Sequence, residues 1–203
     1  TILRPYQVES VNETCENYSG LLSISPAGGK TLISTAIIKK FSEYKSVVIT
    51  KNNKLVNQNH EDYIKHGINS KVISKESTKK QIEDVIENHD VVVLTYKKFN
   101  NIAEYFDGFR GVLIFDEVHE FGESTQQQIE LYLSDCPVRV GMSGSLPDPK
   151  KNPFKEETIQ CFFNHGILYH VPENVLMEEG HIANIHINMF ETDDQFILNE
   201  IED

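Results

Sequence analysis

Four short apolar runs, each followed by a segment of helical periodicity, constrain the fold of this chain more than any other feature. They cover residues 46–50, 90–95, 111–115 and 138–143, and β-branched residues are frequent in them. Runs that are apolar on every residue are typical of parallel strands covered by helices on both faces. The alternation therefore predicts an α/β fold, a parallel β-sheet with helices on both faces, whose ligands bind at the carboxyl ends of the strands.

The remaining segments extend this pattern. Helices are expected at 3–18, at 53–66 up to Gly67, at 78–88, 97–106, 125–133 and 154–163, and after 25–31. Further strands are expected at 21–25, 71–74 and 167–171, with an alternating segment at 184–190. We expect one domain over residues 1–190, followed by an acidic stretch, 191–203, that begins a linker. The alternative for this stretch is a solvated tail.

Composition limits the class of protein. The net charge of −12 argues against a broadly basic nucleic-acid binder, although a local basic rim can still bind a strand. No apolar run approaches the roughly 20 residues of a membrane span, so no membrane partner is expected. Cys15, Cys136 and Cys161 are widely separated and lack metal-ligand spacing, which favours reduced thiols and a cytoplasmic location.

A phosphate-binding loop is predicted between the strand 21–25 and the helix that follows. Gly29, Lys30 and Thr31 form the second half of the pattern G-x-x-x-x-G-K-[ST], while Ile24 stands in place of its first glycine. In such loops backbone N–H groups surround phosphate oxygens, the lysine reaches the β- and γ-phosphates and the hydroxyl binds Mg²⁺. The alternative is a plain turn at Gly28 and Gly29. The predicted loop residues are Pro26, Ala27, Gly28, Gly29, Lys30 and Thr31.

Two carboxylates follow the most hydrophobic strand, 111–115. Asp116 and Glu117 would lie at the edge of the sheet that faces the predicted loop. A carboxylate in this position of a P-loop enzyme holds Mg²⁺, and its neighbour can deprotonate the attacking water. We assign the metal role to Asp116, with Thr31, and the general-base role to Glu117; the alternative is a pair of acids that cap the next helix.

The motifs and their order resemble the first RecA-like domain of superfamily-two helicases and translocases of the DEAH/DExH type. The resemblance covers nearly the whole chain. Its motifs are 3–7, 25–31, 50–52 with Leu55 and Gln58, 93–96, 116–119 and 143–145. Val118 and Gly144 depart from the residues most common in the family. The sequence at 141–148, GMSGSLPD, is most similar to that of UvsW-type phage branch-migration helicases.

The resemblance implies a function and further site residues. It implies a RecA-like P-loop domain that binds ATP and Mg²⁺ and belongs to an ATP-dependent helicase, incomplete here because hydrolysis needs a second RecA-like domain of the same longer chain. Lys30, Glu117 and His119 would be the catalytic residues, Gln7 would read adenine and Arg4 would lie beside it in the nucleotide site. Nucleic acid, DNA or alternatively RNA, would contact Thr50, Lys51 and Thr95, and Ser143 and Ser145 would couple the two sites. A phage protein of this kind would act in the host cytoplasm.

Some individual residues keep a simpler alternative. Gln7 could be an exposed polar residue in a first helical turn, Tyr6 a core tyrosine and His119 a histidine at a helix start. Two other functions also stay open. One is a switch module that binds nucleotide without motor activity, and the other is the motor part of a restriction or nuclease assembly.

Overall fold

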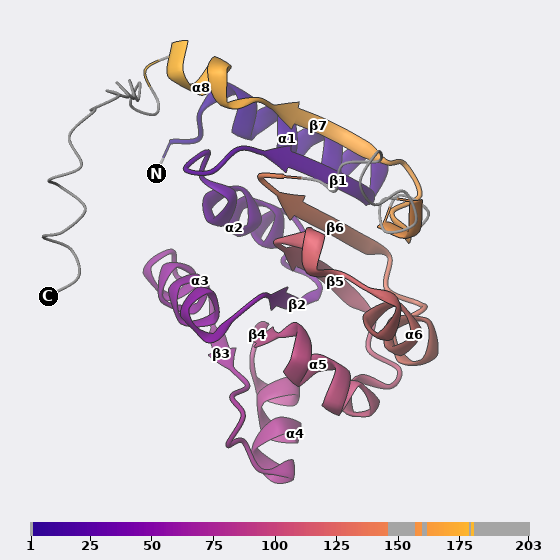
Figure 1. The fold of residues 1–203 in the computed structure, drawn as a ribbon. Coiled ribbons are helices and arrows are strands. Elements are labelled where there is room, and N and C mark those ends of the chain that lie inside the picture. The colour runs from indigo at the N-terminus through magenta and orange to yellow at the C-terminus, as the bar shows by residue number, and fades with distance from the viewer. Residues whose placement is uncertain (1, 146–156, 160–161, 179, 181–203) are drawn as a thin grey trace, which may run out of the picture.

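A single seven-stranded sheet organises the chain (Figure 1). The structure is a computed structural model that describes residues 2–145, 157–159, 162–178 and 180. All strand pairs are parallel, and the order across the sheet is β3-β4-β2-β5-β6-β1-β7. The strands are β1 (Ser19–Ile24), β2 (Lys45–Thr50), β3 (Ser70–Val72), β4 (Val91–Thr95), β5 (Gly111–Asp116), β6 (Val138–Ser143) and β7 (Ile167–Val171).

Helices connect the strands. They are α1 (Pro5–Asn17), α2 (Lys30–Lys40), α3 (Asn53–Lys65), α4 (Lys79–Asn88), α5 (Tyr96–Ile102), α6 (Glu123–Tyr132) and α8 (Glu173–Glu178), with 3₁₀ turns η1 (Ala103–Phe106) and η2 (Val118–Glu120). Thr78 caps α4 by accepting from the N–H of Gln81, and Gly67 follows α3 with a positive φ of 75°. The boundaries of α3 and α4 therefore lie within one residue of the positions predicted from these turn and cap residues.

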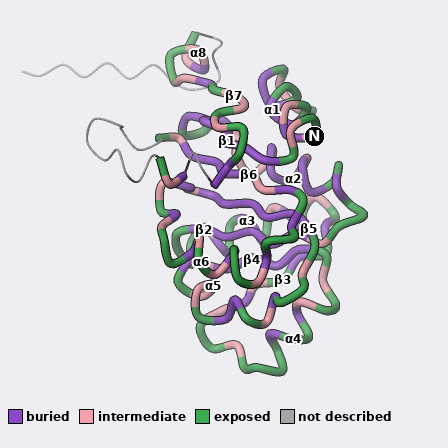
Figure 2. The backbone as a smooth tube through the Cα atoms, turned by 90° about the vertical axis from the view of Figure 1, so that its right-hand side faces the viewer, coloured by how far each residue is buried: buried purple, intermediate pink, exposed green. Residues whose placement is uncertain are grey.

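Two buried apolar clusters lie on opposite faces of the sheet. Figure 2 shows that the backbone of the central strands is buried along most of its length. Val47 and Ile49 of β2 belong to the cluster with α4, α5 and α6, whereas Val48 belongs to the cluster with α1, α2 and α3. Successive side chains of a strand point to opposite faces, so each central strand needs apolar residues throughout. The predicted α/β fold with helices on both faces is confirmed.

Two details differ from the sequence prediction. The segment expected as one helix at 97–106 is α5 followed by the 3₁₀ turn η1. The strand expected at 21–25 begins two residues earlier, at Ser19. The segment 184–190 and the linker 191–203 lie outside the described residues, as does much of the helix expected at 154–163. None of the described helices is long and apolar enough to cross a membrane.

Candidate nucleotide site

The loop between β1 and α2 contains two residues with a left-handed backbone, a conformation that glycine adopts most easily. Gly29 has φ 79° and Ala27 has φ 63°, both in the left-handed region. A Cβ on Gly29 would lie 2.5 Å from Nε2 of Gln7, and one on Gly28 would lie 2.6 Å from Cγ2 of Ile24. Glycines are needed here because side chains would collide with neighbours. The loop places Lys30 as the first residue of α2, where the helix N-terminus favours anions.

Asp116 lies at the carboxyl end of β5 and is 6% exposed. Its Oδ2 accepts from the Thr50 hydroxyl at 3.4 Å and from Nδ2 of Asn59 at 3.3 Å, and its Oδ1 accepts from the backbone N–H of Glu117 at 3.1 Å. Burial raises the pKa of Asp116 above its usual value, and the hydrogen bond from Asn59 partly opposes that rise. The carboxylate is therefore held in place by three donors.

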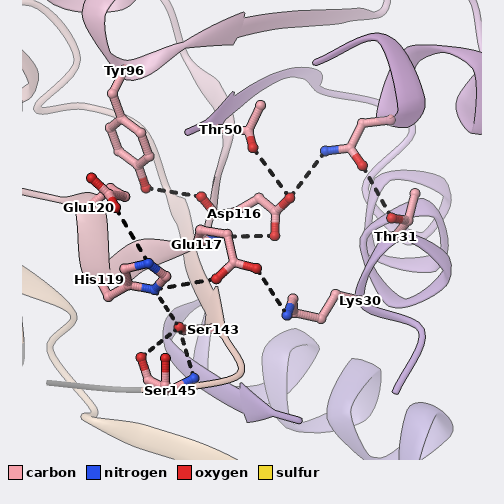
Figure 3. A network of polar contacts seen from close by, with 11 residues as sticks. Lys30, Thr31, Thr50, Tyr96, Asp116, Glu117, His119, Glu120, Ser143 and Ser145 are labelled. Atoms are coloured by element: carbon pink, nitrogen blue, oxygen red, sulfur yellow. Dashed lines mark hydrogen bonds and ion pairs between the residues drawn. The ribbon is translucent and has the colours of Figure 1, made fainter. Parts of the chain in front are cut away.

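Glu117 turns back toward the loop because its backbone is left-handed, with φ 54°. Its Oε1 lies 3.2 Å from Nζ of Lys30, and its Oε2 lies 3.3 Å from Nδ1 of His119 (Figure 3). A non-glycine residue in this region costs on the order of 1–3 kcal/mol and is frequent in active sites. The strained residue is the one that joins the acidic motif to Lys30, the lysine predicted to reach the phosphates.

His119 links Glu117 to the end of β6. Its Nδ1 lies 3.0 Å from Oγ of Ser143, which donates to the carbonyl oxygen of Ser145 at 2.8 Å and accepts from the N–H of Ser145 at 3.2 Å. The Ser143 proton is thereby used, so Nδ1 of His119 carries the proton and donates. Its Nε2 lies 3.5 Å from Oε1 of Glu120. Of the two residues predicted for coupling, Ser143 is thus in direct contact with His119, and Ser145 is joined to it through Ser143.

The residues predicted to read adenine lie against the loop. Gln7 is 2% exposed; its Oε1 accepts from the backbone N–H of Arg4 at 2.9 Å, and its Nε2 donates to the carbonyl oxygen of Gly28 at 3.1 Å. The Tyr6 hydroxyl donates to the same oxygen at 2.9 Å and accepts from Nη1 of Arg4 at 3.1 Å. Gln7 is therefore not the exposed polar residue of the simpler alternative, and its contact with adenine stays a prediction.

The three residues predicted to contact nucleic acid differ in position. Thr50 is fully buried, and its hydroxyl is used on Asp116. Thr95 pairs with Thr50 across the sheet and caps α5 by accepting from the N–H of Lys98 at 3.2 Å. Lys51 is exposed and forms an ion pair with Glu120, at 2.6 Å between Nζ and Oε1. A nucleic-acid contact by Thr50 would require its bond to Asp116 to be exchanged, and one by Lys51 would require its ion pair with Glu120 to open. Contact of these three residues with nucleic acid stays a prediction.

Asn59 of α3 is a site residue that the sequence prediction missed. It is 3% exposed, and its amide lies between Thr31, whose Oγ1 donates to Oδ1 at 3.1 Å, and Asp116. The helix buries Val56, Asn59 and Tyr63, which follow one another at helical spacing. A polar residue within that otherwise nonpolar stripe was the available signal.

The residues around Asn59 fit a magnesium ion bound together with phosphates. Thr31 and Asp116 supply oxygen ligands, which this ion prefers, and Mg²⁺ commonly takes one or two carboxylates plus substrate phosphates and water. Within the described residues no group of three or more His, Cys, Asp or Glu side chains could hold a metal by itself. A cation here would therefore depend on the nucleotide for further ligands.

Known proteins share this architecture. The ATP-dependent DNA helicase uvsW of Enterobacteria phage T4 is 27% identical over 190 residues, which are 90% of this chain and 37% of that protein. A crystal structure of the UvsW helicase from bacteriophage T4 superposes with a TM-score of 0.67 at 24% identity, over 82% of this chain and 59% of that one. A second T4 UvsW structure gives 0.66 at 22% identity, over 81% and 33%.

The chain thus spans less than two thirds of the length of these relatives, and the two structures establish a RecA-like fold. The family model described as "Type III restriction enzyme, res subunit" matches residues 1–148, the part that carries the phosphate loop, the acidic pair and the His119–Ser143 contact. This chain belongs to that family.

Proposed function

We propose that this chain is the ATP-binding motor domain of an ATP-dependent nucleic-acid helicase or translocase that acts on DNA. The observation that carries the proposal is the meeting of Lys30 and Thr31 with Asp116 and Glu117 at the carboxyl edge of the sheet, with Nζ of Lys30 3.2 Å from Glu117. This is the arrangement in which P-loop enzymes transfer a phosphoryl group to water. The T4 relative is named an ATP-dependent DNA helicase, which supports DNA as the substrate.

Each group has a role in hydrolysis. Lys30 would leave Glu117 to contact the β- and γ-phosphates, and the loop N–H groups would surround the same oxygens. Glu117, released from Lys30, would accept a proton from the attacking water. His119 would keep Glu117 oriented through Nδ1. Because the same nitrogen contacts Ser143, a shift of His119 when the γ-phosphate binds or leaves would also move Ser143. A bound Mg²⁺ would supply charge neutralisation of the phosphates, held by Thr31 and Asp116.

Hydrolysis also needs positive charge next to the transferred phosphoryl group, because negative charge on its oxygens has to be stabilised in the transition state. The chain contains three arginines. Arg110 precedes β5 and pairs with Asp135 at 2.8 Å, Arg139 near the start of β6 donates to the carbonyl oxygen of Ser134, and Arg4 donates to Tyr6. Arginines supplied in trans contribute on the order of 10³–10⁵ in rate. We therefore propose that a second RecA-like domain supplies them.

Nucleotide binding by the 203-residue chain tests the proposal. Lys30→Ala should weaken binding of Mg·ATP by about 2–5 kcal/mol, because it removes the lysine that reaches the phosphates. Lys80→Ala, at an exposed position of α4, is the matched control and should bind as the parent does. Affinity is measured by fluorescence anisotropy of a labelled ATP, and circular dichroism checks the fold. Equal affinity of parent and Lys30→Ala would overturn the proposal.

Phosphate release tests the need for a second domain. The chain alone should hydrolyse ATP very slowly and should not unwind duplex DNA. It should bind single-stranded DNA weakly, with an affinity that falls steeply as salt is raised. Rapid, DNA-stimulated turnover by this chain would show that no second domain is needed. ATP binding that never supports hydrolysis or strand displacement when the chain is joined to a second RecA-like domain would instead favour the switch module.

A further inference from the structure

A polar seam joins α2 to α3 beneath the nucleotide site. The Thr31 hydroxyl donates to Oδ1 of Asn59 at 3.1 Å, and one helical turn further the Ser34 and Tyr63 hydroxyls lie 2.9 Å apart. Ser34 and Tyr63 are fully or almost fully buried, as is Asn59. Buried polar side chains reduce stability unless they are paired, so this seam fixes how the two helices meet.

The orientation of the Asn59 amide follows from its neighbours. An ionised Asp116 can only accept hydrogen bonds, so the NH₂ group of Asn59 must face it, at 3.3 Å from Oδ2. The amide oxygen then faces Thr31 and must accept the hydroxyl proton. The contacts on both sides agree with a single orientation of the amide.

This orientation of the amide leaves lone pairs free on both oxygens that would bind the cation. The Thr31 proton points to Asn59, which leaves the hydroxyl lone pairs for a ligand. Oδ2 of Asp116 already accepts from Thr50 and Asn59, whereas Oδ1 accepts only from the backbone N–H of Glu117. An ionised carboxylate oxygen can accept about two hydrogen bonds, so the remaining free lone pair is on Oδ1.

We propose that Asn59 is a positioning residue for the divalent cation of the nucleotide site, because its amide joins the Thr31 hydroxyl to the Asp116 carboxylate and fixes both. The inference rests on the proposed function. It assigns to α3 a part in cation binding, because Asn59 of this helix contacts both proposed ligands of the cation, Thr31 and Asp116. A residue that merely satisfied buried groups would affect folding, whereas a positioning residue affects how strongly Mg²⁺ aids nucleotide binding.

The test separates these two roles. Binding of a fluorescent ATP analogue carrying a methylanthraniloyl group is measured in excess Mg²⁺ and again in EDTA, for the parent, Asn59→Leu, Asn59→Gln and Asn57→Leu. Asn57 is an exposed residue of the same helix and provides the control. Mg²⁺ should tighten binding to the parent and to Asn57→Leu equally. Asn59→Leu should lose about 10- to 100-fold of that gain, since this is the usual effect of removing a residue that holds a metal ligand.

Affinity in EDTA should be the same for the parent and Asn59→Leu. Asn59→Gln, which keeps both amide groups, should retain more of the Mg²⁺ effect than Asn59→Leu does.

Equal Mg²⁺ effects in the parent and Asn59→Leu would overturn the positioning role of Asn59 and leave the proposed function standing. Equal losses in Mg²⁺ and in EDTA would also overturn it, in favour of a structural role. If Asn59→Leu does not fold, Asn59→Ala, which also removes the amide, takes its place, and an Mg²⁺ effect in Asn59→Ala equal to that of the parent overturns the inference. A parent that binds no nucleotide would overturn the proposed function itself.

Discussion

Replacing Glu117 by glutamine should tighten ATP binding while it slows hydrolysis. In the structure Lys30 is held by Glu117, with 3.2 Å between Nζ and Oε1, and the two side chains are 16% and 23% exposed. Lys30 must leave this partner before it can reach the phosphates. The ion pair therefore competes with the nucleotide for the lysine.

The size of this competition follows from the geometry. Two unit charges 3.2 Å apart attract by about 5 kcal/mol at an effective dielectric constant of about 20. Desolvation and side-chain ordering offset most of that attraction, and exposed pairs measure about 0.2–1 kcal/mol. This pair is mostly shielded from solvent, so we take about 1 kcal/mol, which corresponds to about fivefold in affinity. Loss of the general base should lower the rate of hydrolysis by roughly 10²–10⁴-fold.

A double-mutant cycle isolates the pair from the general loss of negative charge. The dissociation constant of labelled ATP is measured for the parent, Glu117→Gln, Lys30→Ala and the double variant, and single-turnover hydrolysis is measured for the first two, joined to a second RecA-like domain. Glu117→Gln should tighten binding about fivefold in the parent but not in Lys30→Ala. The same gain in both backgrounds would mean that Glu117 acts through bulk charge, and no gain in either would refute the competition.

Three further outcomes follow from the structure. Phe121→Ala should lower the free energy of unfolding by about 3–5 kcal/mol in urea titrations, because the ring is fully buried and its centroid lies 4.6 Å from that of Phe162; Leu131→Ala, 65% exposed, should change it by less than about 0.5 kcal/mol. Burial lowers the pKa of His60 below 6.5, so its contribution to stability is present above pH 6.5 and is lost as pH falls toward its folded pKa. The stability difference between the parent and His60→Gln should therefore change over that range, and parallel pH curves would contradict the assignment. Gly28→Ala should weaken ATP binding, because the new Cβ would lie 2.6 Å from Ile24, while Gly122→Ala, with nothing within 4 Å, should not; equal affinities would show that the loop relaxes freely.

The sequence by itself determined the elements and the two motifs that the site is built on. Apolar strands such as 111–115 are set locally, by β-branched and aromatic residues, and the residue that follows such a strand lies at its carboxyl end. Since the carboxyl ends of parallel strands meet at one edge of a sheet, Asp116 and Lys30 could be expected on the same side of the molecule. Local chemistry likewise required Gly29 in the loop, where φ is positive.

The tertiary structure decided which side chains touch within that edge. Asn59 meets Thr31, 28 residues away, and Asp116, 57 residues away, because α2 and α3 pack against the same face of the sheet at a distance that no local pattern encodes. Thr50 is a strand-end threonine like Thr95, yet it is buried against Asp116, since β2 lies between β4 and β5 in the sheet. Strand order depends on how whole helices cover the sheet, so the partners of a strand-end residue become known only once the sheet is assembled.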